Sequence, residues 1–123
     1  MNITYQDWVD NSNVLAYVVK VPGTRQTMET EISIGVYIAQ NEVSVAIETG
    51  RIVEGVTSDC NLSRLADDSD FEGRPRSHFV RNEVASLHDA IVECDRLKAQ
   101  FDARIEAMVE ADRAAFERSL SGA

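Results

Sequence analysis

The C-terminal third of the chain lacks helix breakers: from Arg76 to Ser121 there is no glycine and no proline. Apolar side chains recur there at steps of three and four, which predicts a seam along one side of a helix. A continuous helix from Arg76 to Ser119 would be about 65 Å long. No domain of 123 residues is that wide. The pattern therefore predicts either a long helix with its seam against a second copy of the chain, or a helix that breaks and folds back as a helical hairpin.

The uncovered seam leads to a prediction about assembly. Apolar surface that a single chain leaves in water is stabilised by association, most simply with two-fold symmetry. We therefore expect a homo-oligomer, a dimer or higher, with the seam at its interface. The predicted interface residues are Val84, Leu87, Ile91, Phe101, Ile105 and Met108.

The first half of the chain has the alternating pattern of half-buried strands. Met28 to Ala39 and Val43 to Glu48 place apolar residues on one side and polar or small residues on the other. Asn13 to Val21 is rich in β-branched residues and ends at a Pro-Gly turn signal, and Arg51 to Thr57 is a weaker fourth strand. Short connections between them predict an antiparallel meander.

Together these patterns predict an α+β fold: an N-terminal antiparallel β-meander of about four strands, followed by a long C-terminal helix or a helical hairpin. We expect a single domain over residues 1–123. It would comprise a β-rich half (1–58), a loop and junction (59–76) and a helical half (77–121). A helix over Thr4 to Val9 and an extra edge strand are both compatible with the opening residues.

Charge and cysteine content narrow the function classes. The formal net charge is −9, which disfavours direct binding to nucleic acid or to an anionic membrane and favours basic partners. Two cysteines, Cys60 and Cys94, form neither a disulfide framework nor a zinc site. There is no signal-peptide pattern and no apolar run of membrane-spanning length. We expect a cytoplasmic protein without membrane contact.

One short segment reverses the charge of the chain. Gly73 to Asn82 carries three arginines and a histidine and no acidic residue. If a helix begins there, its N-terminal N–H groups and the arginines favour an anion such as phosphate, while phenylalanine rings stack on a base. Arg104 would join them if a partner subunit lies nearby. The predicted ligand-binding residues are Phe71, Arg74, Arg76, Phe79, Arg81, Asn82 and Arg104.

A purely structural role for the same residues is the alternative. The arginines would then pair with the preceding acidic loop of Asp67, Asp68 and Asp70. Phe79 would act as a hydrophobic staple, and Asn82 would cap a helix that begins at Glu83.

Catalysis has no positive signal. His78 and His88 are too few for an acid–base pair or a metal centre, and the acidic loop lacks the ligand spacing of a calcium site. We expect no catalytic residues, no metal ion and no cofactor, and therefore a protein that is not an enzyme.

In layout the chain resembles small phage anti-defence proteins that sequester cyclic ADP-ribose signals of the Thoeris system. The matching region runs from Phe71 to Asn82, with helix arginines such as Arg104. The resemblance implies an oligomeric sponge for a cyclic nucleotide or ADP-ribose-type ligand, acting in the host cytoplasm. Small phage anti-CRISPR proteins are similar in length and acidity. That second likeness implies an inhibitor that blocks a basic or nucleic-acid-binding site on a host protein. A structural oligomer without a ligand is the third hypothesis.

Overall fold

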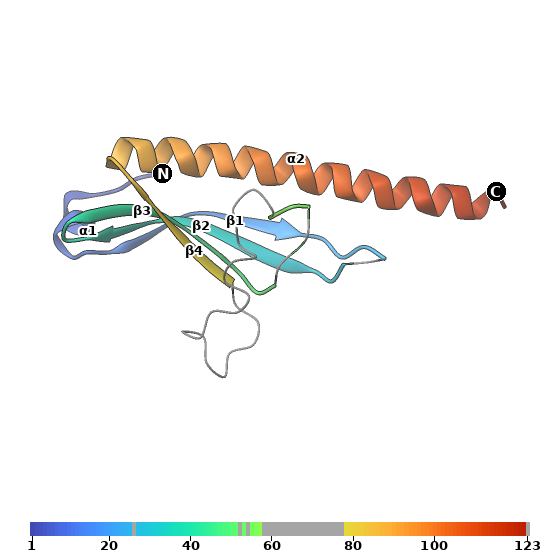
Figure 1. The fold of residues 1–123 in the computed structure, drawn as a ribbon, viewed down its shortest axis with the longest axis horizontal. Helices are drawn as coiled ribbons and strands as arrows, with labels where there is room; N and C mark the ends of the chain where they lie inside the picture. The colour runs from blue at the N-terminus through green and yellow to red at the C-terminus, as the bar shows by residue number, and fades with distance from the viewer. Residues whose placement is uncertain (26, 52, 54, 58–77, 123) are drawn as a thin grey trace.

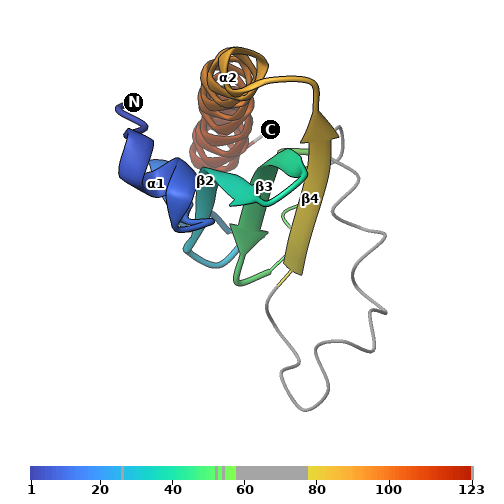
Figure 2. The same ribbon diagram turned by 90° about the vertical axis from the view of Figure 1, so that its left-hand side faces the viewer.

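The computed structural model describes residues 1–25, 27–51, 53, 55–57 and 78–122. They form one antiparallel sheet of four strands in the order β1-β2-β3-β4, with a long helix, α2 (Leu87–Leu120), across one of its faces (Figures 1 and 2). The predicted α+β class is confirmed, with one continuous helix and no hairpin.

The first three strands lie where their alternation predicts them. They are β1 (Asn13–Val21), β2 (Thr30–Ala39) and β3 (Glu42–Thr49). Gln40 and Asn41 make the two-residue connection between β2 and β3, since Ala39 pairs with Glu42. The opening residues form the short helix α1 (Tyr5–Val9), in which Thr4 and Asp7 make a reciprocal capping box.

The fourth strand is a correction. β4 is His78–Val84, which pairs with β3 along its length, from Val43 opposite Val84 to Thr49 opposite His78. We predicted the fourth strand at Arg51 to Thr57 and a helical half from residue 77. The described residues of the 51–57 segment contain no strand. The helix instead begins at Leu87, ten residues later than predicted. Ser86 is its N-cap and accepts a hydrogen bond from the N–H of Asp89.

The core lies between α2 and the face of the sheet that turns toward it. Period-two alternation sends one set of β2 and β3 side chains to this face, and they are buried. From α2 the fully buried residues are Ala90, Cys94, Leu97 and Phe101, one turn apart along one side of the helix. The chain's own sheet therefore covers the first half of α2.

This packing changes the interpretation of the predicted seam. Phe101 is completely buried, and Leu87, Ile105 and Met108 are partly buried against the same core. Val84, in β4, also packs there. Ile91 lies beside this buried line and is only half-buried. A second copy is therefore not needed to cover most of these residues, because the sheet already does so.

Candidate functional site

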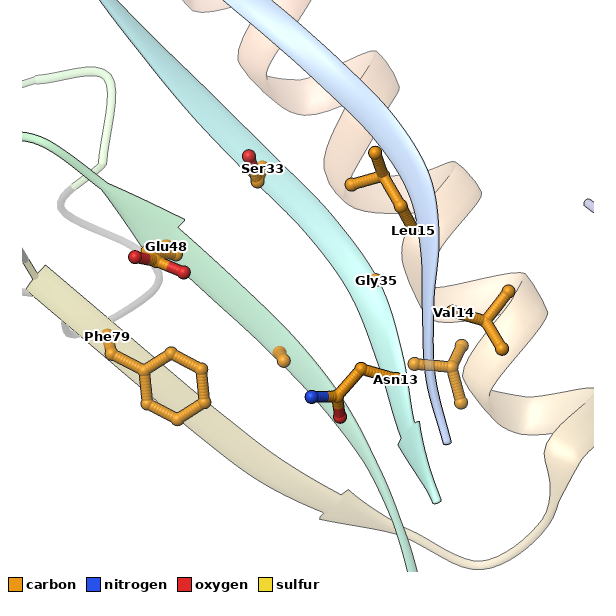
Figure 3. Close-up of a pocket in the computed structure, with 9 residues that line it drawn as sticks. Asn13, Val14, Leu15, Ser33, Gly35, Glu48 and Phe79 are labelled. Carbon is orange, nitrogen blue, oxygen red and sulfur yellow. The ribbon is translucent and has the colours of Figure 1, made fainter. Parts of the chain in front are cut away.

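The face of the sheet away from α2 carries a shallow trough. It has a volume of about 180 Å³ and opens on the side of the strands opposite the helix (Figure 3). Its lining comes from all four strands: Asn13, Val14, Leu15, Ser33, Gly35, Val36, Ala46, Glu48 and Phe79. No helix or strand in the described part of the chain lies over this face (Figure 2).

Small residues make the floor of the trough. Gly35 on β2 is directly opposite Ala46 on β3, and Ser33 is opposite Glu48. Because Ser33, Gly35 and Ala46 have small side chains or none, the backbone itself forms the base of the depression there. A Cβ atom at Gly35 would approach the carbonyl oxygen of Val14 to 2.7 Å, so even alanine cannot be added there without moving β1.

β1 is irregular directly above this glycine. The pairing of β1 with β2 shifts between Leu15, which is opposite Gly35, and Tyr17, which is opposite Ile34. The extra residue is a bulge, and it turns Leu15 to the open face and Tyr17 to the helix face. Leu15 is 62% exposed and forms one apolar wall of the trough.

Phe79 forms the opposite wall. It lies on β4 opposite Glu48, and its ring is seen across the trough from Leu15 in Figure 3. The ring is half-buried, so one part packs on the sheet and the rest is available to a ligand. An aromatic ring that is partly exposed in this way can stack with a flat group.

Polar groups stand at the rim of the trough. Asn13 contributes an amide and Glu48 a carboxylate. Two residues along β4 from Phe79, on the same face, Arg81 stacks on the ring of Tyr37 with its guanidinium 4.5 Å from the ring centre. The Nε atom of Arg81 also lies 3.3 Å from a carboxylate oxygen of Glu42, in an ion pair that is partly exposed.

The predicted ligand-binding residues do not all share this face. Phe79 and Arg81 do. Asn82 is the next residue of the same strand, so its side chain leaves the opposite face. Arg104 is on α2, where its Nη1 atom donates to the carbonyl oxygens of Gly55 at 3.0 Å and Val56 at 3.5 Å. Phe71, Arg74 and Arg76 lie outside the described residues, as do Asp67, Asp68 and Asp70.

Arg104 therefore has a structural role in this chain. Its guanidinium connects the segment around Gly55, whose backbone has a φ of 84°, to α2. Val53, Val56 and Thr57 of that segment are buried.

The prediction of an anion site at a helix N-terminus rested on a helix that begins within the basic segment. Residues 78–84 are a strand, and the helix starts after it. The macrodipole of α2 therefore acts at Ser86 and Leu87 and not at the arginines.

Sequence reasoning missed most of the trough. Asn13, Leu15, Ala46 and Glu48 were not singled out, although a signal was present: on the polar side of β2 and β3 the central positions are all small. A wet sheet face normally carries long polar side chains, so a run of small residues in two adjacent strands indicates a depression.

A second polar group lies on the helix side of the sheet. The hydroxyl of Tyr17 donates to a carboxylate oxygen of Asp95, and the Nζ atom of Lys98 lies 5.8 Å from the centre of the Tyr17 ring. The hydrogen bond to Asp95 raises the pKa of Tyr17, and burial adds to the effect. These contacts of Tyr17 with Asp95 and Lys98 connect β1 to α2.

Cys94 lies beneath the same helix turn and is fully buried. Its thiol points to the carbonyl oxygen of Gly35, with Sγ and O 3.8 Å apart. Burial raises the pKa of the Cys94 thiol to about 11, and the carboxylates of Asp95 and Glu93 act in the same direction. A protonated, inaccessible thiol is a packing group and not a nucleophile.

Comparison with protein-family models, with curated proteins and with solved structures found no match for this chain. Among the described residues, no cluster of three or more histidine, cysteine or acidic side chains has the arrangement of a metal site. In the same part of the chain, no helix combines the length and apolar character needed to cross a membrane.

Proposed function

We propose that this chain is a non-enzymatic binding protein that holds a small nucleotide-type ligand on the open face of its sheet. The observation that carries the proposal is the trough between Leu15 and Phe79, with Arg81 on the same face. A base ring stacks on Phe79 over the backbone floor at Gly35 and Ala46. Aromatic stacking of this kind stabilises a bound base by about 1–3 kcal/mol.

The charges around the trough give the ligand a direction. Glu48 repels a phosphate but accepts a hydrogen bond from an amino group of a base. Arg81, two residues beyond Phe79 on the same strand, would attract the phosphate, so we expect the anionic end of the ligand to lie beside Arg81. Glu42 already interacts with Arg81, so a phosphate binds there in competition with a carboxylate.

Sequestration is the role that such a site would serve. The trough is open, and among the described residues its lining has one carboxylate, Glu48, and no histidine or cysteine, so we expect a ligand held there to be withdrawn from solution without being changed. The proposal agrees with the layout resemblance to phage proteins that sequester cyclic ADP-ribose signals. It places the ligand on the sheet face, and not at the start of a helix.

The test is calorimetric titration with ADP-ribose and cyclic ADP-ribose, with adenosine and pyrophosphate as the two halves of the ligand. We expect Phe79→Ala to weaken adenosine and ADP-ribose alike, and Arg81→Ala to weaken only the phosphate-bearing probes. Ala46→Leu, which fills the trough from a half-exposed position, should abolish all binding. Lys20→Ala is the matched control, because it removes a positive charge from β1 on the same open face of the sheet but outside the trough. No heat with any of the four probes would overturn the proposal.

A second candidate is an acidic inhibitor of a basic protein, and it is favoured by the net charge of −9. Association of that kind weakens steeply as salt rises, because exposed charges are screened within about 10 Å at 0.1 M salt. Nucleotide binding in a trough with apolar walls depends on salt much less. Measuring affinity for a basic partner at 0.05 M and 0.5 M salt separates the two functions.

A further inference from the structure

The C-terminal end of α2 extends past the rest of the described chain (Figure 1). Asp112 accepts a hydrogen bond from the backbone N–H of Arg25, at 3.3 Å, in the connection between β1 and β2. Beyond it, from Arg113 to Leu120, every residue except Ala114 is exposed. We call this part, residues 113–120, the overhang.

The overhang is not an ordinary solvated helix end, because large apolar side chains project from it. Phe116 is 61% exposed and Leu120 is 71% exposed. With Ile105 and Val109, which are half-buried, they follow one another at steps of four, seven and four residues. These steps place all of them along one flank of the helix, beside the line that packs on the sheet.

The spacing of these four apolar residues is symmetric. The steps are four, seven and four residues in both directions along the helix, and the midpoint of the set falls between Asp112 and Arg113. A second copy of the helix, laid antiparallel about that midpoint, would place Ile105 against Leu120 and Val109 against Phe116. The charges at the midpoint are opposite, so Asp112 of each copy would meet Arg113 of the other. Such a surface is complementary to itself, as a two-fold interface requires.

We propose that α2 pairs antiparallel with α2 of a second copy through Ile105, Val109, Phe116 and Leu120. This interface shares only Ile105, which is partly buried against the core, with the seam predicted from the sequence, most of which the chain's own sheet covers. It does not depend on a ligand in the trough, which lies on the other face of the sheet.

The interface is small. Two helices in contact over sixteen residues meet along about 24 Å, and stable dimers usually bury at least about 1,200 Å². We therefore expect a dimer that dissociates on dilution, with the apolar flank as its main source of stability and the pair of charges as its source of register.

The first test is the mass of the full chain in solution across a range of concentrations, by sedimentation equilibrium. We expect twice 13.7 kDa at high concentration, and 13.7 kDa for Phe116→Asp at the same concentration. Val92→Asp is the matched control, because Val92 is 53% exposed on the same helix but lies outside the proposed contact of residues 105–120, so this variant should leave the dimer intact. A single-chain mass at every concentration, or equal loss of the dimer in both variants, overturns the proposal.

The second test distinguishes antiparallel from parallel pairing by disulfide trapping in a Cys60→Ser background. In an antiparallel pair Arg113→Cys lies near the axis and should cross-link to its own copy in high yield. Two copies of Leu120→Cys would be about 22 Å apart along the axis and should not cross-link. Leu120→Cys mixed with Ile105→Cys should cross-link. High yield from Leu120→Cys alone indicates a parallel pair and contradicts the proposal.

Discussion

The two halves of α2 have nearly the same composition but differ in how far their apolar side chains are buried. In the first half the sheet buries Ala90, Cys94, Leu97 and Phe101 completely. In the overhang an equally large aromatic residue, Phe116, is mostly in solvent. Apolar spacing alone therefore does not determine what covers a helix. The sheet beneath α2 ends before the helix does (Figure 1).

The largest effect that tests this comparison comes from two identical substitutions. Phe101→Ala removes a fully buried ring from the core and should lower the free energy of unfolding by about 3–5 kcal/mol. Phe116→Ala should change it by less than about 0.5 kcal/mol in dilute protein, where the chain is a monomer. Urea denaturation of both variants measures the difference. Equal losses would mean that the overhang packs on its own chain.

The buried thiol of the first half gives a pH-dependent version of the comparison. The pKa of Cys94 is raised from 9.0 to about 11 in the folded chain. Between these values the unfolded chain has lost the proton and the folded chain has kept it, so stability is full below pH 9 and falls as pH rises toward 11. By pH 10.5 the free energy of unfolding should have fallen by about 2 kcal/mol.

Urea titrations of wild type and Cys94→Ala at pH 8 and pH 10.5 measure this loss. The alanine variant is less stable at pH 8 because of the cavity, but its stability should depend less on pH. The same pH dependence in both proteins would show that another group is responsible.

Two serines allow the ends of α2 to be compared. Ser86 is the N-cap and accepts from the N–H of Asp89, whereas Ser119 in the overhang donates its hydroxyl to the carbonyl of Ala115. Ser86→Ala should cost about 1 kcal/mol of stability, because it leaves a helix N–H without its cap. Ser119→Ala should be nearly neutral. Thermal unfolding of the two variants measures both effects, and a larger loss for Ser119→Ala would contradict the comparison.

The smallest effect is expected where the overhang begins. Asp112→Ala removes the exposed hydrogen bond to the N–H of Arg25 and should cost about 0.5 kcal/mol. Glu117→Ala, further along the overhang, is the control and should cost nothing measurable in dilute protein. A loss above about 1.5 kcal/mol for Asp112→Ala would mean that this contact holds the hairpin more firmly than one hydrogen bond can.

Residue patterns predicted only part of the candidate site. Phe79 and Arg81 were predicted as ligand-binding residues and do lie together on the open face. Asn82 was grouped with them because it belongs to the same short segment, Gly73 to Asn82, at the expected start of a helix. Consecutive residues of a helix turn by only about 100°. On a strand they turn by about 180°, so Arg81 and Asn82 leave opposite faces of β4. An error in the element type therefore divided the predicted site.

Local pattern by itself determined β1, β2, β3 and the existence of a long helix. Period-two alternation and a segment free of glycine and proline are properties of neighbouring residues, and they need no partner to be read. The tertiary structure decided the rest. His78–Val84 is an edge strand whose residues suit a helix as well. It becomes β4 because β3 offers it hydrogen bonds from residues 29 (Thr49 to His78) to 41 (Val43 to Val84) positions earlier in the chain.

The burial of α2 likewise depends on the tertiary structure. Large apolar residues occur along both the first half of the helix and the overhang. Those above the sheet become core and those past it stay exposed, because burial depends on what lies opposite, and that is a property of the whole fold.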